Sequence, residues 1–243
     1  MIEVVGLTKS YQDLVAVRDL SFRVEPGQVI GLVGPNGAGK TTTLRCLSGI
    51  LPPTTGQVTI AGHDITREPV AAKKNLAFVP DEPQLFDYLT VEEHLQFVSR
   101  IYQVNDAARL SGPLLEELEL TDHQRKLPNE LSRGMRQKLA IACGLIHNPG
   151  VLLFDEPLTG LDPVGIRRMK DTILTRARNG ASVLLSSHLL HLVEELCTGV
   201  VIIARGRLLA YGSIASIVAN RPELAGMDLE EVFLAITGSE GSR

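Results

Sequence analysis

The sequence lacks the features that mark a membrane-spanning, a secreted or a nucleic-acid-binding protein. No apolar run approaches the ~18 residues that a membrane helix needs. The most apolar stretches, 151–154 and 200–203, have the length of buried strands. The N-terminus carries no basic segment and no cleavage signal, so no secretory leader is expected. The formal net charge of −4 gives no general attraction to DNA, RNA or anionic lipid, and we expect no nucleic-acid partner.

Cysteine is scarce. The three residues Cys46, Cys143 and Cys197 are scattered and fit no CxxC spacing. This pattern predicts buried thiols of a cytoplasmic protein rather than a disulfide framework or metal ligands. Any association with a membrane would therefore come from a partner.

What is present is the composition of a folded α/β protein. The chain has 243 residues, of which 44% are hydrophobic and 21% charged, enough to bury a large core. Apolar runs bounded by glycine or proline predict strands, and helix-prone segments follow several of them. The expected strands are 29–33, 58–60, 76–79, 151–154, 182–186, 200–204 and 207–211. Their alternation with helices predicts a mostly parallel sheet with helical cover and ligands at the carboxyl ends of its strands.

The segment 90–131 has a different, helical character. Apolar residues recur there at helical spacing, at positions 91, 95, 98 and 102, and 107–120 is rich in leucine and glutamate. Ser132 then suits the N-cap of a further helix. We therefore expect an inserted helical subdomain, 90–131, that runs into this helix. The core is expected to comprise 1–89 and 132–238, with a flexible tail at 239–243.

Residues 34–41, Gly-Pro-Asn-Gly-Ala-Gly-Lys-Thr, fit the phosphate-loop pattern G-x-x-x-x-G-K-[ST] at every fixed position. With a strand before the loop and a helix after it, backbone N–H groups converge on an anion at the helix N-terminus. Lys40 is expected to bridge the β- and γ-phosphates, and the Thr41 hydroxyl to bind Mg²⁺. The loop therefore predicts a site for a nucleoside triphosphate with Mg²⁺. Its expected binding residues are Asn36, Gly37, Ala38, Gly39, Lys40, Thr41 and Thr42.

An acidic pair, which is the second element of the predicted site, follows the apolar run 151–154. Asp155 comes at the carboxyl end of this predicted strand, where its carboxylate can hold Mg²⁺ directly or through water. Glu156 comes next and suits a general base that orients and polarises an attacking water. Such a pair alone also begins ordinary loops, but together with the phosphate loop it predicts hydrolysis of the nucleotide.

The stretch Leu131-Ser-Arg-Gly-Met-Arg-Gln137 narrows the family. It resembles the LSGGQ signature of the ATP-binding cassette family, with Arg133 for the first glycine and Met135 for the glutamine. Taken alone, the stretch could equally be a plain helix start. The resemblance implies a P-loop NTPase fold with an N-terminal antiparallel β portion. It also implies that Ser132 and Gly134 contact the γ-phosphate of ATP across a dimer interface, and a serine hydroxyl with N–H groups that open a helix suits an anion.

Further elements resemble the family's motifs in order along the chain. Tyr11 lies where the family carries an aromatic that stacks on adenine, although simple packing is the alternative. Residues 160–162, Gly-Leu-Asp, resemble the D-loop that crosses the dimer interface. His188, at the end of the run 182–186, resembles the switch histidine that contacts the γ-phosphate. These matches imply ATP as the nucleotide and His188 as a catalytic residue beside Lys40 and Glu156.

A further position, outside the signature, departs from the family pattern. The family usually has glutamine after a Val-Pro strand end, whereas this chain has Asp81 after Val79-Pro80. Asp81 is shorter and anionic, so it would reach Mg²⁺ only through a water or a shift of its loop. It is retained as a candidate metal residue beside Thr41 and Asp155.

The resemblance implies the ATPase subunit of an ABC transporter, from the branch that pairs with separate exporter-type permeases. Two such subunits, identical or homologous, would enclose ATP head to tail. An integral membrane permease would hold the chain at the inner face of the cell membrane. The apolar residues at positions 85, 86, 88 and 89 either contact that permease or pack within the subdomain. The alternative function is a soluble ATPase of translation or DNA repair, although such proteins usually carry two cassettes or a long coiled coil.

Overall fold

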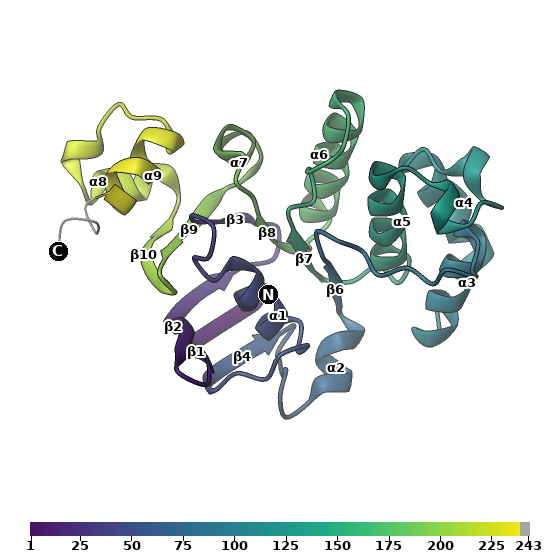
Figure 1. Ribbon diagram of the computed structural model, residues 1–243, viewed down its shortest axis with the longest axis horizontal. Coiled ribbons are helices and arrows are strands. Elements are labelled where there is room, and N and C mark those ends of the chain that lie inside the picture. Colours follow the sequence, from purple (N-terminus) through teal and green to yellow (C-terminus); the bar gives the residue numbers. More distant parts are fainter. Residues whose placement is uncertain (239–243) are drawn as a thin grey trace.

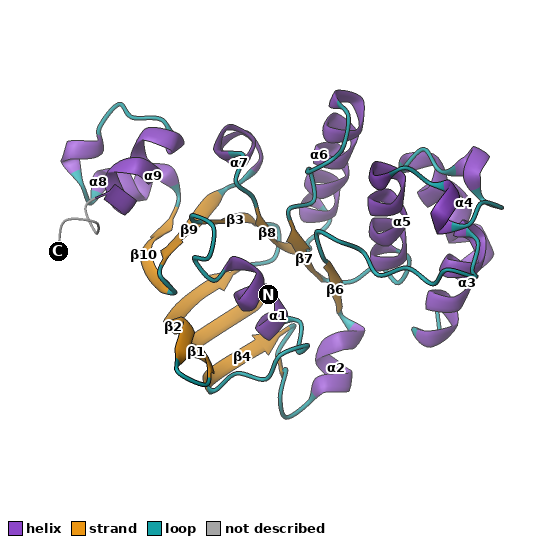
Figure 2. Ribbon diagram, in the orientation of Figure 1, coloured by secondary structure: helices purple, strands orange, loops and turns teal. Residues whose placement is uncertain are grey.

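In a computed structural model, which describes residues 1–238, the chain forms two β-sheets covered by helices (Figures 1 and 2). The expected tail 239–243 lies outside the described residues. A four-stranded antiparallel sheet has the order β2-β1-β4-β5, and a six-stranded sheet has the order β10-β9-β3-β8-β7-β6. The strands are β1 (Ile2–Tyr11), β2 (Leu14–Val24), β3 (Val29–Val33), β4 (Thr55–Ile60), β5 (His63–Asp64), β6 (Leu76–Val79), β7 (Val151–Asp155), β8 (Ser182–Ser186), β9 (Gly199–Ala204) and β10 (Arg207–Gly212).

The six-stranded sheet is buried on both faces. Strands β9, β3, β8, β7 and β6 run parallel, and β10 joins β9 in antiparallel fashion at one edge. In β7, Leu152 and Phe154 pack into one apolar core, whereas Val151 and Leu153 pack into the other. Burial on both faces explains why these strands appear as continuous apolar runs rather than as alternating patterns. The predicted, mostly parallel sheet with helical cover is confirmed.

The two sheets sandwich the helix that follows the phosphate loop. Helix α1 (Lys40–Leu47) contacts β2 and β4 on one side and β7 on the other (Figure 1). Its side chains Leu44, Cys46 and Leu47 are fully buried in the core shared by both sheets. The N-terminal antiparallel sheet therefore packs against one side of α1, and the parallel sheet packs against the other.

The remaining helices cover the parallel sheet or lie beyond its two edge strands (Figure 2). Helices α3 and α4 lie within 90–131, beside α5. The division into domains at these residues stays a prediction. The helices are α2 (Pro69–Lys74), α3 (Val91–Ile101), α4 (Ala107–Glu117), α5 (Arg133–Leu145), α6 (Pro163–Arg178), α7 (Leu190–Leu196), α8 (Ile214–Ala219) and α9 (Leu229–Gly238). None of the helices within 1–238 is both long and apolar enough to cross a membrane.

Polar contacts attach the end of α4 to α6. The Glu117 carboxylate accepts hydrogen bonds from the Thr172 hydroxyl at 2.7 Å and from the Arg176 guanidinium at 3.0 Å. Two residues further on, Glu119 pairs with Lys138 of α5 at 2.6 Å and with Arg168 of α6 at 3.2 Å. These contacts fix the orientation of the inserted helices against α5 and α6. They thereby also fix the position of the segment that begins α5.

Candidate functional site

Glycines shape the phosphate loop between β3 and α1. At Gly34 a Cβ would clash with the carbonyl oxygen of Ile203 in β9. At Gly39, whose φ is 104°, a Cβ would lie 2.6 Å from the carbonyl oxygen of Ala16 in β2. Both sites bring the loop against backbone, and neither leaves room for a side chain. The loop can thus pass tightly from the sheet into α1 with its N–H groups turned toward one point.

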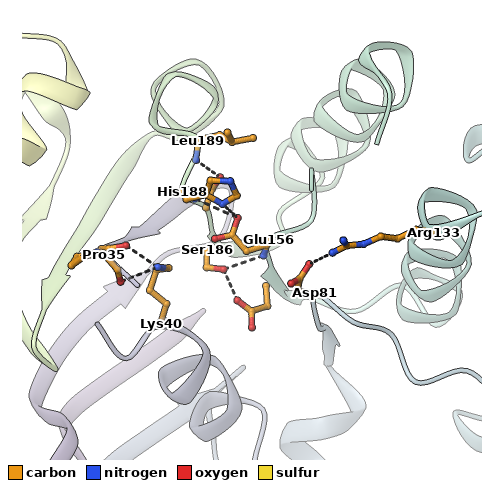
Figure 3. Close-up of polar contacts among 11 residues, drawn as sticks. Pro35, Lys40, Asp81, Arg133, Glu156, Ser186, His188 and Leu189 are labelled. Atoms are coloured by element: carbon orange, nitrogen blue, oxygen red, sulfur yellow. Dashed lines mark hydrogen bonds and ion pairs between the residues drawn. The ribbon is translucent and has the colours of Figure 1, made fainter. Parts of the chain in front are cut away.

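Lys40 lies across its own loop. Its ammonium group donates to the carbonyl oxygens of Gly34 at 2.7 Å and Pro35 at 3.3 Å (Figure 3). Burial lowers the pKa of Lys40, and the negative charges of Glu156 and Asp155 act in the opposite direction. The cation therefore lies between the loop and the two carboxylates, where phosphate oxygens would compete for it.

A serine on the neighbouring strand positions Asp155. This carboxylate ends β7 and is only 4% exposed. The Ser186 hydroxyl at the end of β8 donates to it at 2.6 Å and accepts from the Glu156 N–H at 3.0 Å. Because a buried carboxylate is costly without such partners, Ser186 fixes both acidic residues relative to the sheet.

Glu156 and His188 meet at the same edge of the sheet. His188 Nδ1 lies 2.8 Å from Glu156 Oε2, and the His188 N–H donates to the same oxygen at 3.3 Å (Figure 3). Glu156 has a φ of 52°, which is uncommon for a residue with a side chain and costs backbone energy. The strand order β3-β8-β7 explains the meeting, since the phosphate loop, His188 and Glu156 follow adjacent parallel strands.

A cavity of about 410 Å³ joins the phosphate loop to the acidic pair Asp155 and Glu156. It contains one wall from the antiparallel sheet, where Tyr11 is 41% exposed, and one from the acidic pair. Hydroxyl and carboxylate oxygens are the donors that suit Mg²⁺, and Thr41 and Asp155 supply one of each on the same cavity. The lining residues are Tyr11, Leu14, Ala16, Asn36, Gly37, Ala38, Gly39, Lys40, Thr41, Thr42, Asp155 and Glu156.

The signature residues do not line this cavity. Ser132 is exposed and caps α5, where its hydroxyl accepts from the Met135 N–H at 3.2 Å. Gly134 packs on the turn at 160–162, since a Cβ there would lie 3.1 Å from the Gly160 carbonyl oxygen. One chain therefore brings the phosphate loop, acidic pair and His188 together and leaves Ser132 and Gly134 facing elsewhere.

Asp81 also lies apart from the cavity. Its carboxylate pairs with the guanidinium of Arg133, with Oδ1 and Nη2 3.3 Å apart (Figure 3). The expected reach to Mg²⁺ through a water or a loop shift stays a prediction. The structure adds a partner for Asp81, because Arg133 is itself a residue that departs from the family pattern.

The apolar residues after Asp81 divide into two kinds. Leu85 packs against the larger core, whereas Tyr88 is 92% exposed. Phe86 is half-exposed and rests edge-on against Phe97 with ring centroids 5.0 Å apart. Its N–H also donates to His94 Nε2 at 2.9 Å. Packing thus accounts for Leu85 and for one side of Phe86, and Tyr88 is available to a partner.

Sequence reasoning missed three residues around the site. Ser186 carries a signal, because it ends a buried strand immediately before Ser187 and His188, yet its bond to Asp155 depends on strand order. Leu14 and Ala16 line the cavity beside Tyr11. They follow Tyr11 across a tight turn between β1 and β2, and an exposed leucine there is the available signal.

The three cysteines carry thiols with little thiolate character. Burial raises the pKa of Cys46 to about 11 and those of Cys143 and Cys197 to about 12. Since the thiolate is the reactive form, we expect negligible labelling by a disulfide reagent at pH 8 in the folded protein and complete labelling in denaturant. Rapid labelling of any thiol in the folded chain would contradict this expectation.

Together, the phosphate loop, the acidic pair after a parallel strand and the strand order define a P-loop nucleoside triphosphatase. The family model described as ABC transporter matches residues 17–159. The chain therefore belongs to the ABC transporter family, and it is an ATP-binding ATPase subunit of that family.

Individual relatives agree over the full length of the chain. It is 35% identical to "ABC transporter ATP-binding protein NatA" of Bacillus subtilis (strain 168), with 97% of each chain covered. A solved "ATP binding subunit of ABC transporter" is 33% identical and covers 98% of this chain and 99% of its own, with a TM-score of 0.93. The dimeric ATP-binding cassette MJ0796, solved in a post-hydrolysis state with ADP and Pi, has a TM-score of 0.82 at 21% identity. The match covers 88% of this chain and 99% of the MJ0796 chain, and it shows the shared fold. These relatives favour the transporter subunit over the soluble translation or repair ATPase.

Proposed function

We propose that two copies of this chain, or one copy and a homologous subunit, enclose ATP and Mg²⁺ head to tail and hydrolyse the ATP to drive a membrane permease. The observation that carries the proposal is Glu156, held by His188 at 2.8 Å beside the phosphate-loop cavity. A carboxylate fixed in this place suits a general base for water attack on a γ-phosphate.

The polar residues of the cavity and Tyr11 have distinct roles in this proposal. The loop residues 36–42 bind the phosphates, Lys40 neutralises the β- and γ-oxygens, and Tyr11 stacks on the base. Mg²⁺, when bound, neutralises charge on the phosphates, and Thr41 and Asp155 would hold it. Asp81 remains a candidate for an indirect, water-mediated contact with Mg²⁺.

The proposed chemistry needs one proton acceptor. As the water oxygen bonds to the γ-phosphorus, the bond from that phosphorus to the β–γ bridging oxygen breaks and a water proton passes to Glu156. In this proposal His188 orients the Glu156 carboxylate through the 2.8 Å contact and also contacts the γ-phosphate. Lys40 stabilises the charge on the oxygens of ADP and phosphate, and Thr41 and Asp155 would hold an Mg²⁺ that adds to this stabilisation.

A second chain completes the site in this proposal. Ser132 and Gly134 lie outside the cavity of their own chain, yet they open a helix of 13 residues with N–H groups that suit an anion. The dimeric relative solved with ADP and Pi supports an assembly of two chains around nucleotide. Turnover should therefore depend on protein concentration.

In this proposal a permease partner holds the protein at the membrane. The described residues contain no helix that could span a bilayer, and the relative NatA is named as the ATP-binding protein of a transporter. We propose docking at the inner face of the cell membrane, where the exposed Tyr88 and the half-exposed Phe86 offer apolar contacts.

Ser132→Ala tests the two-chain site. We expect the ATP concentration for half-maximal dimerisation to rise about tenfold or more, because a hydrogen bond to a charged phosphate is lost. ATP affinity of the monomer should not change. Sedimentation velocity across an ATP titration measures the first quantity, and nucleotide binding at low protein concentration measures the second.

Ser213→Ala is the matched control for this test. Ser213 caps α8 in the same manner, by accepting from the Ser216 N–H at 3.1 Å, and lies away from the cavity. Its loss removes a helix cap without touching the proposed interface. A collapse of monomer ATP affinity in Ser132→Ala would show that the serine acts within its own chain and would overturn the trans site.

A further inference from the structure

Two of the three positions that depart from the family pattern, Asp81 and Arg133, contact each other. Asp81 replaces a glutamine on the loop between β6 and α3, and Arg133 replaces a glycine at the first position of α5. They are 52 residues apart in sequence, and their side chains form an ion pair across the gap between the two segments (Figure 3). A single replacement would leave an unpaired charge beside the nucleotide machinery, and here the second replacement compensates it.

The Arg133 side chain extends past a glycine, which has no side chain to obstruct it. Its stem passes Gly160, where a Cβ would lie 3.4 Å from both Cδ and Nε. The guanidinium then enters a shallow hollow of about 300 Å³, which also contains Arg136 and Glu82. Arg133 therefore joins the signature segment to the 160–162 turn and to the Asp81 loop of the same chain.

The ion pair between Arg133 and Asp81 contributes little to the stability of the fold, and Arg133 can exchange Asp81 for a stronger partner. Arg133 and Asp81 keep 56% and 41% of their side-chain surface exposed, and one nitrogen meets one oxygen at 3.3 Å. Exposed pairs of this kind are weak, because water screens them and long side chains lose freedom in them. A phosphate group carries more charge and accepts a guanidinium in bidentate fashion, so it is the stronger partner.

Arg133 also has the right neighbours for such an exchange. It lies between Ser132 and Gly134, the two residues proposed to meet the γ-phosphate of the second chain's ATP. When that triphosphate approaches, the guanidinium needs only to rotate about its own side-chain bonds to leave Asp81. The side chain is long, and 56% of its surface is exposed.

We propose that Arg133 is a phosphate-binding residue that Asp81 holds in the single chain and releases when the second chain's triphosphate arrives. The inference rests on the proposed head-to-tail dimer. In this inference Asp81 is a positioning residue that acts through Arg133. The ion pair must break before the chains associate, so it raises the ATP concentration that dimerisation requires.

The exchange predicts effects of opposite sign, which a merely structural pair would not give. In a Glu156→Gln background, which slows hydrolysis, Arg133→Gln should raise the ATP concentration for half-dimerisation about tenfold, since a charged bidentate contact is lost. Asp81→Asn should lower it by up to about fivefold, because a weak competing pair is removed. The double variant should match Arg133→Gln alone. Sedimentation velocity with Mg²⁺ and ATP measures all four proteins.

Glu82→Gln is the matched control for charge. Glu82 lines the same hollow one position further on and forms no described ion pair with Arg133, so the half-dimerisation concentration should stay unchanged. Equal effects of Glu82→Gln and Asp81→Asn would overturn the proposal, because a general field would then explain both. A weakening by Asp81→Asn would also overturn it, because Asp81 would then support closure, either through the pair or through Mg²⁺.

Failure of this inference differs from failure of the proposed function. If Ser132→Ala weakens dimerisation and Arg133→Gln does not, the dimer stands and the role of Arg133 is overturned. If the parent chain forms no ATP-dependent dimer at all, the proposed function fails and the exchange fails with it.

Discussion

Glu156→Gln is expected to lower ATP turnover about 100-fold or more, in line with the loss of a general base. The amide has the same shape as the carboxylate and can still meet His188, so the loop and the cavity keep their geometry. ATP binding should therefore survive. Because hydrolysis is what separates the proposed dimer, the variant should accumulate as a dimer in ATP and Mg²⁺.

Phosphate release at saturating ATP and size-exclusion chromatography with light scattering measure the two effects. Glu230→Gln, an exposed glutamate in the first turn of α9, provides a control for a neutralised carboxylate away from the cavity. Turnover that stays within about twofold of the wild type, well short of the loss expected for a base, would remove Glu156 from that role.

Gly34→Ala is expected to destabilise the fold and to abolish measurable ATP binding. The added Cβ would clash with the Ile203 carbonyl oxygen and lie 2.9 Å from the Cβ of Ala38. The clash is with backbone of a central strand, which cannot give way as a flexible side chain can. Overpacking of this kind costs about 3 kcal/mol. For a chain of this size, that corresponds to a fall in Tm of roughly 6–12 °C.

Gly150→Ala is the matched control, since a Cβ at Gly150 meets nothing within 4 Å and its φ is not positive. Its Tm and its ATP affinity should both equal those of the wild type. Thermal unfolding and equilibrium nucleotide binding provide the two measurements for each variant. Normal ATP affinity in Gly34→Ala would show that the loop does not need its close approach to β9.

The buried strands and the phosphate loop were predictable because their signals are local. The strands β3, β6 and β8 begin and end at the predicted residues, since burial on both faces gives unbroken apolar runs. The loop is specified by fixed residues at fixed spacing, and its conformation needs glycine at Gly34 and Gly39. For the same reason, the fold class follows from the sequence.

Long-range pairs were not predictable from local patterns. The bond from Ser186 to Asp155 depends on β8 lying next to β7, although the residues are 31 positions apart. The pairing of Asp81 with Arg133 depends on α5 packing beside β6, since Asp81 follows β6 and Arg133 begins α5. Both residues were noted as departures from a pattern, yet only the packing brings the two departures together.

Helix boundaries differ where one turn decides them. The helix expected over 107–120 ends at Glu117, because Leu118 and Glu119 leave the helix and Glu119 takes a φ of 56°. That turn directs the Glu119 carboxylate toward Lys138 and Arg168. The competing tertiary contacts therefore override the helical propensity of the sequence.

The location of α1 between the two sheets has a consequence for mutational tolerance. Residues such as Leu44 and Cys46 are fully buried in the core between the two sheets, so a change of volume there has no open side on which to relax. Any shift would move the first turn of the helix, which carries the end of the phosphate loop. In a saturation library scored only for ATPase activity, these buried positions should appear as intolerant as the loop itself, although they never touch the nucleotide.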